Sequence, residues 1–373
     1  MKRFGWILAV LMLASPAWAT NKNISVQQLK DMLDSLQQQK KTDTEVADRL
    51  KEIELNEELT DSTANSLISY LPGPLSGEQI EILKGQSAFL APPATDLPAT
   101  PAPDEAAQKA ILAKAADFVS RVYVQNPHLS VIKNMLRYED QVKITNSIGL
   151  HSPNLLLDPI KLVGKQVDLV ETNKGVEATA VSRAKTKWGL NGELSEGEPG
   201  TNLGTIFLEA SSAGKIVWLR WQMIDGKQIA VFSFAVEKKK SRFDVNYCCF
   251  PKTETEDRIG LPMMVGTIQS VSTWETFKKV VGYHGEFFIN PDTGLVVRVI
   301  THADMKPTEF VSREDRRIDY GTVVVAGREY QLPRVSVTVM EAVPNGDNPN
   351  STCIFRHTMF HVSYQNYKLA GTF

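Results

Sequence analysis

Residues 215–236 read KIVWLRWQMIDGKQIAVFSFAV, two runs of apolar and β-branched residues joined by Asp225 and Gly226. Runs of this composition are typical of strands, and an Asp-Gly pair between two of them is a strong signal for a tight hairpin turn. The stretch therefore predicts two paired antiparallel strands.

The same pattern recurs toward the C-terminus. GEFFIN (285–290) is followed by LVVRVITHAD (295–304), IDYGTVVVA by REYQLPRVSVTVMEA (318–342), and residues 351–369 predict a last long strand. Hairpins that follow one another without intervening helices favour an antiparallel meander. Residues 148–204 are instead rich in Gly, Asn and Pro, and they predict irregular loops with one strand near residues 176–188.

The N-terminal part of the chain predicts helices. Ser25, Thr42 and Ser76 each stand three positions before Glu or Gln, which is the spacing of a capping box at a helix start. Apolar residues at helical spacing follow the first two, and Pro72 and Pro74 interrupt the pattern. We expect these short amphipathic helices to pack on one another.

A proline-rich linker and a longer helix complete the predicted organisation. The helix, from about Asp104 to Tyr123, carries apolar residues at helical spacing and is expected to pack against the sheet. The fold class is therefore α+β, with a curved, half-barrel-like antiparallel sheet. The predicted divisions are a signal peptide at 1–19, a helical unit at 20–90, the linker at 91–104, and a helix-plus-sheet domain at 105–373.

The first residues have the composition of a secretory signal peptide. Lys2 and Arg3 precede an apolar run, and Ala17-Trp18-Ala19 supplies small residues at a cleavage site. The run is shorter than the roughly 20 residues of a membrane span, which disfavours an uncleaved anchor. We expect cleavage near Ala19, a periplasmic or secreted mature protein and no transmembrane segment in it.

The net charge of the chain disfavours nucleic acid as a binding partner. The formal charge of the chain is −2, and loss of Lys2 and Arg3 makes the mature chain more acidic, so nucleic acid is not an expected partner.

In an oxidising compartment Cys353 is expected to form a disulfide with Cys248 or Cys249, which point to opposite faces if they lie on a strand. The alternative is three buried, reduced cysteines.

The usual catalytic signatures are absent from the sequence. It contains no Gly-x-Ser-x-Gly elbow, phosphate loop or His-Glu-x-x-His zinc motif, and we expect no metal and no cofactor. Residues 292–294 (Asp-Thr-Gly) predict a hairpin turn, because an aspartic protease needs a second such triplet. His357 and His361 lie on a predicted strand, about 13 Å apart, which is too far for one zinc ion. His284 with Glu286 is the remaining candidate for acid–base chemistry.

The predicted hairpin of residues 215–236 carries an apolar face. By strand alternation Val217, Leu219, Trp221 and Met223 share one side, and Trp218 lies on the other. This side, together with the neighbouring strands, predicts a candidate ligand-binding face that comprises Leu219, Trp221, Met223, Phe232, Phe234, Phe287 and Ile289. The alternative is an ordinary sheet core covered by the helix of residues 104–123, and a void under that helix distinguishes the two.

Four ordered phrases carry a family resemblance: residues 71–104, 232–251 (FSFAVEKKKSRFDVNYCCFP), 283–299 (YHGEFFINPDTGLVVRV) and 319–333 (DYGTVVVAGREYQLP). They resemble a family of uncharacterised exported acidobacterial proteins, with the same block order across nearly the whole mature chain. The C-terminal half more distantly resembles lipoprotein-carrier and periplasmic-sensor half-barrels, in which a long helix backs a curved sheet. This second resemblance implies a fold more than a function.

The sequence favours an exported, noncatalytic binding or carrier module for an apolar or lipid-like ligand. The first alternative is a structural or interaction protein with a solid core, which recruits a protein partner through its N-terminal helices. The second is an enzyme of unfamiliar type that uses His284 and Glu286.

Overall fold

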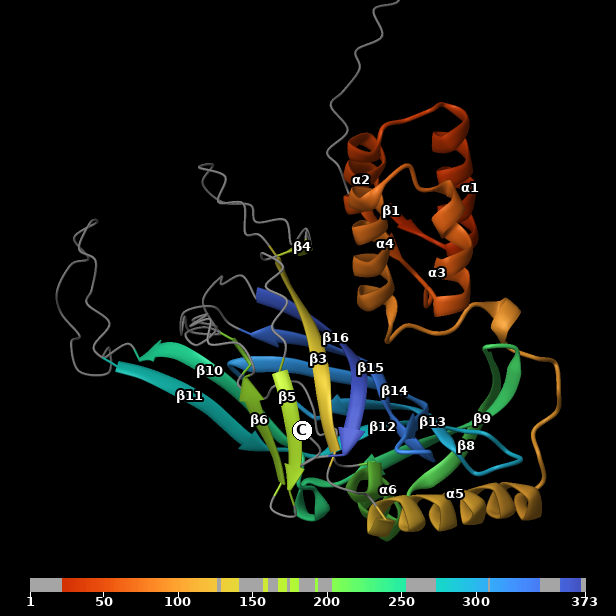
Figure 1. Ribbon diagram of the computed structural model, residues 1–373, viewed down its shortest axis with the longest axis vertical. Coiled ribbons are helices and arrows are strands. Elements are labelled where there is room, and N and C mark those ends of the chain that lie inside the picture. Colours follow the sequence, from red (N-terminus) through yellow and green to blue (C-terminus); the bar gives the residue numbers. More distant parts are fainter. Residues whose placement is uncertain are drawn as a thin grey trace, which may run out of the picture.

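The computed structural model has an α+β fold, with N-terminal helices followed by an antiparallel sheet (Figure 1). Within the described residues, no helix is both long enough and apolar enough to span a bilayer. The structure describes residues 22–125, 129–140, 157–159, 167–172, 175–180, 192–193, 203–252, 273–307, 309–342 and 356–369.

The N-terminal unit is a small helical bundle with its own core. Buried leucines at 29, 33, 50, 59 and 67 pack together in it, as the helical spacing predicts. Its elements are β1 (Lys22–Ile24), α1 (Val26–Gln38), α2 (Asp43–Lys51), β2 (Ile53–Leu55), α3 (Asp61–Leu67), the short 3-10 helix η1 (Ile68–Tyr70) and α4 (Pro74–Ser87), with β1 and β2 paired in parallel.

Two of the three predicted capping boxes are confirmed. Ser25 and Thr42 cap α1 and α2, each in a complete box. The box predicted at Ser76 is wrong, because Pro74 already occupies the first turn of α4. Asp43 of α2 caps that helix instead. Its carboxylate accepts hydrogen bonds from the backbone N–H groups of Leu75 and Ser76, both at 2.9 Å.

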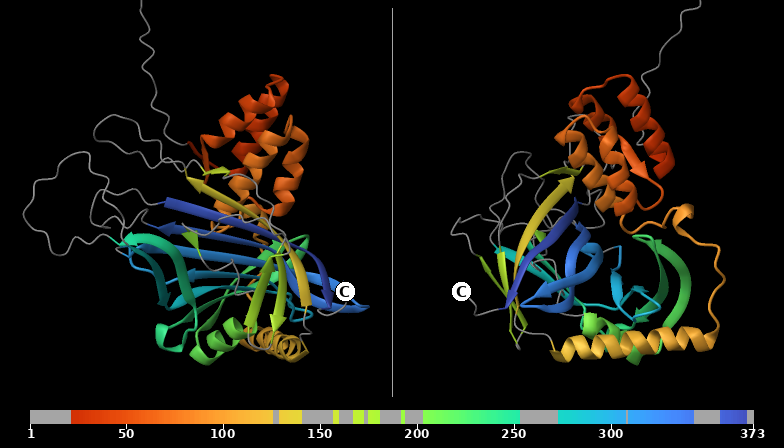
Figure 2. Two further views of the ribbon diagram at one scale, coloured as in Figure 1. Left: turned by 60° about the vertical axis from the view of Figure 1, so that its left-hand side comes forward. Right: turned by 45° about the vertical axis from the view of Figure 1, so that its right-hand side comes forward.

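The linker passes along the edge of the sheet. It contains the 3-10 helix η2 (Ala94–Asp96) and leads to α5 (Glu105–Gln125), close to the predicted 104–123. The indole Nε1 of Trp221 donates a hydrogen bond of 2.9 Å to the carbonyl of Pro101. The linker therefore carries the chain past the hairpin of residues 216–236 from one side of the sheet to the other (Figures 1 and 2).

The main sheet has eleven strands, and its hairpins follow the predicted order. Its linear order is β6-β5-β3-β16-β15-β14-β13-β12-β9-β8, with β4 paired to β3, and the described strands do not form a closed barrel. The bounds are β3 (Leu129–Asp140), β4 (Leu157–Pro159), β5 (Val167–Thr172), β6 (Gly175–Ala180), β8 (Ile216–Ile224), β9 (Lys227–Val236), β12 (Tyr283–Ile289), β13 (Val296–Ala303), β14 (Val311–Val325), β15 (Arg328–Ala342) and β16 (Arg356–Leu369). A smaller sheet pairs β11 (Thr273–Val280), β10 (Asp244–Lys252) and β7 (Gly192–Glu193), and η3 (Lys238–Lys240) follows β9.

The predicted turns have the conformations that their residues favour. Asp225 and Gly226 between β8 and β9 have φ values of 48° and 73°, and Ala326 and Gly327 between β14 and β15 have 48° and 77°. In the segment predicted as loops around one strand, the structure describes the short strands β4 to β7 and leaves most other residues undescribed. The predicted strand at 176–188 overlaps β6, and its later residues lie outside the described ranges.

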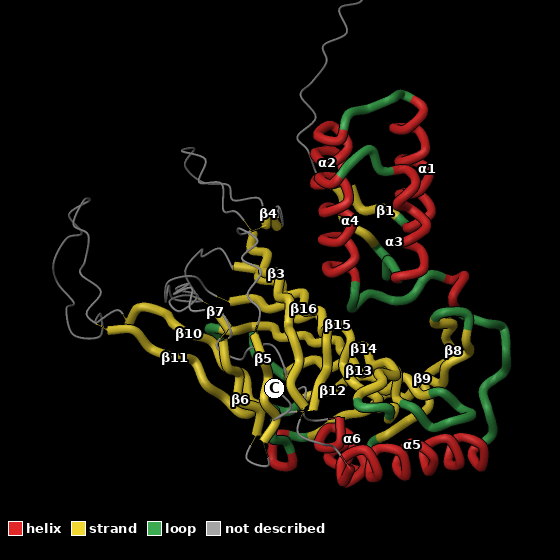
Figure 3. The backbone as a smooth tube through the Cα atoms, viewed as in Figure 1, coloured by secondary structure: helices red, strands yellow, loops and turns green. Residues whose placement is uncertain are grey.

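The face of the sheet that α5 and α6 cover is called the inner face here (Figure 3). Helix α6 (Leu203–Ala213), which sequence reasoning missed, lies against β9, and α5 packs against α6. Phe207 of α6 and Ile111 of α5 belong to the same buried cluster as Phe232 and Phe287 of the sheet. The long helix thus covers the inner face largely through a second, shorter helix.

Strand β8 departs from simple alternation. Its register with β9 shifts between Trp218 and Arg220, so Leu219 is bulged and has no partner. The prediction that Trp218 and Trp221 lie on opposite faces is therefore wrong. Their rings meet at 4.8 Å between centroids, and both pack against the inner core.

The helical unit docks on the opposite, outer face of the sheet (Figures 1 and 2). Ile82 and Ala88 pack against Tyr138, Val337 and Met359 of β3, β15 and β16. Helix α4 approaches β16 closely, because a Cβ added at Gly85 would lie 2.4 Å from the Sδ atom of Met359. Two parts of the chain that are far apart in sequence therefore share an apolar contact.

A buried ion-pair cluster lies in the same contact. Glu58 of the helical unit accepts hydrogen bonds from Arg317 at 2.7 Å and Arg298 at 3.2 Å, and both arginines also bind Asp319. Burial alone would raise the pKa of Asp319, but the two guanidinium groups outweigh it and hold the pKa below its ordinary value. The cluster is charge-balanced only when the two units are together.

We predict that Glu58→Gln loosens the docking of the helical unit. Removal of this buried carboxylate leaves the two guanidinium groups with Asp319 and with the exposed Asp61, which lies 3.6 Å from Arg317. Loss of one partner of a buried pair costs about 3 kcal/mol. Urea unfolding is expected to show that loss, and hydrogen exchange is expected to speed up in α4 and at Arg317.

Glu52→Gln is the matched control, because Glu52 is exposed and its pair with Arg49 lies on the surface. Equal stability of the two variants would contradict a role for the cluster in docking.

Candidate functional site

The residues predicted to form a ligand-binding face fall into three environments. Phe232, Phe234, Phe287 and Ile289 are buried on the inner face. The rings of Phe234 and Phe287 stack at 4.3 Å between centroids, and Phe207 of α6 meets Phe287 at 5.2 Å. The protein's own side chains therefore fill this part of the inner face, and ligand binding there stays a prediction.

The β8 members of that set are separated from one another. Trp221 packs at the border of the inner core and binds the linker, whereas the bulge leaves Leu219 43 % exposed. Met223 lines a groove on the outer face. The predicted face is therefore not continuous. The prediction assumes regular alternation along β8, whereas the bulge at Leu219 interrupts it, and the sequence does not signal that bulge.

His284 and Glu286 lie on the outer face and have different partners. The His284 Nδ1 atom lies 2.9 Å from Asp304 Oδ1, and its side chain is 57 % exposed. Glu286 accepts two hydrogen bonds from Arg220, at 3.1 and 2.8 Å. Neither residue lines the two outer-face pockets described below. This arrangement does not favour an acid–base pair.

The Asp-Thr-Gly triplet and the His357 and His361 pair lie in a turn and on a strand, respectively. Residues 292–294 form the predicted turn, but Asn290 caps it, since its Oδ1 atom accepts hydrogen bonds from the N–H groups of Asp292 and Thr293. His357 and His361 lie on β16, as predicted. Among the described residues, no three His, Cys, Asp or Glu side chains are arranged to hold a metal ion.

The cysteine prediction falls outside the described part of the chain. Cys353 is not among the described residues, and the surroundings of the Cys248 and Cys249 side chains on β10 are not described either. The disulfide between Cys353 and one of this pair stays a prediction.

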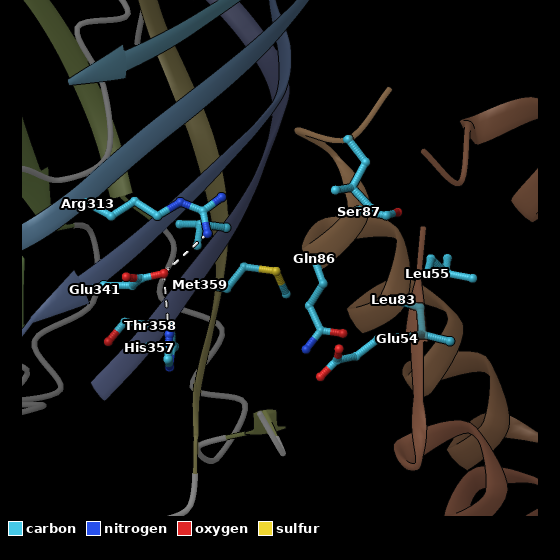
Figure 4. Close-up of a pocket in the computed structure, with 12 residues that line it drawn as sticks. Glu54, Leu55, Leu83, Gln86, Ser87, Arg313, Glu341, His357, Thr358 and Met359 are labelled. Atoms are coloured by element: carbon cyan, nitrogen blue, oxygen red, sulfur yellow. Dashed lines mark hydrogen bonds and ion pairs between the residues drawn. The ribbon is translucent and has the colours of Figure 1, made fainter. Parts of the chain in front are cut away.

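A pocket lies at the junction between the helical unit and the outer face, and we call it the junction pocket (Figure 4). Its volume is about 230 Å³. One wall comes from β2, α4 and the residues after it, and the other from β14, β15 and β16. Most of the lining surface is apolar, and it comes from Leu55, Leu83 and Leu90 on the helical side and from Val339 and Met359 on the sheet side.

Polar groups gather on the sheet wall of the junction pocket. Glu341 lies between Arg313 and His357, with Oε1 at 3.2 Å from Arg313 Nη1 and 3.3 Å from His357 Nε2 (Figure 4). The hydrogen bond from His357, together with the charge of Arg313, holds the pKa of Glu341 below its ordinary value against the effect of burial. Arg313 is shared with Asp315. The opposite wall contributes Glu54 and Gln86.

Sequence reasoning missed the junction pocket. Its residues come from segments separated by more than 200 positions, and each is explained locally by a helix or strand pattern. The Glu341 and His357 pair depends on the register of β15 with β16, where the two residues are directly opposite. The alternating pattern of each strand predicts its faces but not its partner's register.

Comparison of the chain with models of protein families, with curated proteins and with solved structures finds no match. The two resemblances noted from the sequence stay predictions.

We predict that Glu341→Gln lowers stability at neutral pH and flattens its acid dependence. The depressed pKa of Glu341 means that its contribution is present above the unfolded-state pKa and is lost as the pH falls through the folded-state value. Loss of these charged hydrogen bonds is expected to cost about 1–2 kcal/mol at pH 7. Urea unfolding between neutral and acidic pH measures both effects.

Glu329→Gln on the same strand serves as the control, because Glu329 is exposed. An acid dependence in Glu341→Gln identical to that of the wild type would contradict the assignment.

Proposed function

We propose that this protein is an exported, noncatalytic binding module that holds an apolar or lipid-like ligand in the junction pocket. The observation that carries the proposal is a mostly apolar pocket with walls from two packed units and polar groups on one side. Export rests on residues 1–19, which lie outside the described residues. The sheet is strongly bent at β8 and β9 (Figure 2). This bend agrees with the half-barrel resemblance noted from the sequence, which adds support to a carrier role.

The size of the junction pocket limits the ligand. An apolar cavity of about 150 Å³ is enough to hold benzene, and the junction pocket has about 230 Å³. It is smaller than the roughly 300–1,000 Å³ of pockets for drug-sized ligands. The pocket therefore suits one short acyl chain or one ring system, with the rest of a longer ligand outside.

The polar wall favours a ligand whose polar end donates hydrogen bonds. The carboxylate of Glu341 lies on the sheet wall, and Arg313 on the same wall is already paired with Asp315 and Glu341. A ligand carboxylate would face Glu341 while Arg313 is engaged in these pairs, which is unfavourable in a partly buried site. A hydroxyl group can donate to Glu341 at no such cost.

The alternative is a protein-interaction module that recruits its partner through the N-terminal helices. Ile68 and Leu75 support it, since both side chains are exposed on the helical unit. Most of the apolar residues of these helices are nevertheless buried in the unit's core or against the sheet. The junction pocket is therefore the better supported binding feature.

We predict that 1-octanol binds the protein more tightly than octanoate, and that Gln86→Trp abolishes the binding. Gln86 lies on α4, and its side chain points into the junction pocket (Figure 4). An indole there would fill the apolar space without removing a core residue. Ligand-observed NMR with the two probes measures the binding.

Gln27→Trp is the matched control, since Gln27 is exposed on α1 and does not line the pocket. Failure of both probes to bind the wild type, or full binding to Gln86→Trp, would overturn the proposal.

A further inference from the structure

A second and larger cavity crosses the outer face on the other side of the helical unit, and we call it the polar groove. Its volume is about 690 Å³, within the roughly 300–1,000 Å³ range of ligand pockets. The floor is formed by β13 to β16. The start of α3 and the helix η2 form one wall, and the β8–β9 hairpin forms the other.

Three side-chain amides in the polar groove have their oxygen atoms engaged by the protein. Gln222, 1 % exposed, accepts two hydrogen bonds from Arg220 at Oε1, and Gln331, 9 % exposed, accepts one from Thr322. Asn290 accepts two at Oδ1 from the N–H groups of the turn that follows it. None of their NH₂ groups has a partner among the described residues, so three fixed donors remain for a ligand.

Four charged side chains of the polar groove are not engaged with one another. Asp96 of η2 and Asp225 of the hairpin turn contribute carboxylates on the two walls, while Lys227 of the hairpin and Arg334 of the floor contribute cations. None of these four forms an ion pair within the described part of the chain. The other charges of the groove, Asp61, Asp319 and Arg298, are already paired. The unpaired charges therefore balance, and the groove favours a neutral ligand over an anionic or cationic one.

We propose that the polar groove binds a neutral, hydroxyl-rich ligand, a short oligosaccharide. A hydroxyl group both donates and accepts, so a sugar can accept from the three amides and donate to the carboxylates of the walls. Leu295 and Val297 supply apolar surface between these groups for the C–H faces of the sugar rings. The NH₂ groups of these amides have no partner among the described residues, and the oxygen atoms of a sugar can accept hydrogen bonds from them.

The test uses variants that keep the internal hydrogen bonds. Gln222→Glu and Gln331→Glu retain the oxygen that accepts from Arg220 or Thr322 but remove the NH₂ donor. Gln228→Glu is the matched control: this residue lies on the same hairpin, accepts a hydrogen bond from Thr100 and does not line the groove. Arg334→Gln, at an exposed position, tests the groove without disturbing a buried group.

Titration calorimetry of the full chain with cellotriose and maltotriose measures binding, with trigalacturonic acid and a neutral Ser-Gly hexapeptide as comparators. We expect at least one neutral trisaccharide to bind the wild type and Gln228→Glu equally. Gln222→Glu and Gln331→Glu should each weaken it by about tenfold, the effect of one lost buried hydrogen bond, and Arg334→Gln should weaken it measurably.

The proposal is overturned if neither trisaccharide binds. It is equally overturned if the acidic sugar or the peptide binds more tightly, or if all groove variants bind as the wild type does. Melting temperatures equal to that of the wild type show that a loss of binding in the buried variants does not come from unfolding.

Discussion

The position of the helical unit depends on the buried ion cluster of Glu58, Arg298, Arg317 and Asp319. The two arginines and Asp319 belong to the sheet, and without Glu58 they would hold an excess positive charge away from water. Burying an uncompensated charge is far more costly than leaving it in water. The cluster therefore selects one docking position among the many that apolar contact alone would allow. Both cavities of the outer face have walls from both units, so their shape follows from this one position.

Much of the local structure could be predicted from the sequence, because its signals act over a few residues. The capping boxes at Ser25 and Thr42 and the turn at Asp225 and Gly226 belong to this kind. Helix α6 was missed because its short apolar sequence also fits a buried strand or an apolar loop. The bulge at Leu219 was missed because nothing in the alternation of β8 marks where the register with β9 shifts.

The candidate site could not be predicted for a different reason. Glu341 and His357 meet through strand register, and Gln86 faces them through the docking of α4 on the sheet. Neither relation is encoded within a window of sequence, since each depends on packing between segments that are far apart. Four residues of the predicted ligand-binding face do belong to the core. In the sequence, however, aromatic residues that surround a ligand have the same pattern as those that pack against other side chains. Phe207 of α6 provides the other side chain here.

Strands β14, β15 and β16 explain why one docking contact creates two cavities of opposite character. In the middle of these strands Val337 packs against Ile82 of the helical unit, and Arg317 donates a hydrogen bond to Glu58. This contact covers the middle of the outer face. Toward one end, Val339 and Met359 continue the apolar surface into the junction pocket. Toward the other end, Gln331 and Arg334 turn the same surface polar. The helical unit covers the border between the two surfaces, so an apolar ligand and a hydroxyl-rich one would occupy separate ends of the same strands. Because both cavities share the wall that Glu58 fixes, occupation of either would stabilise the docked arrangement by mass action.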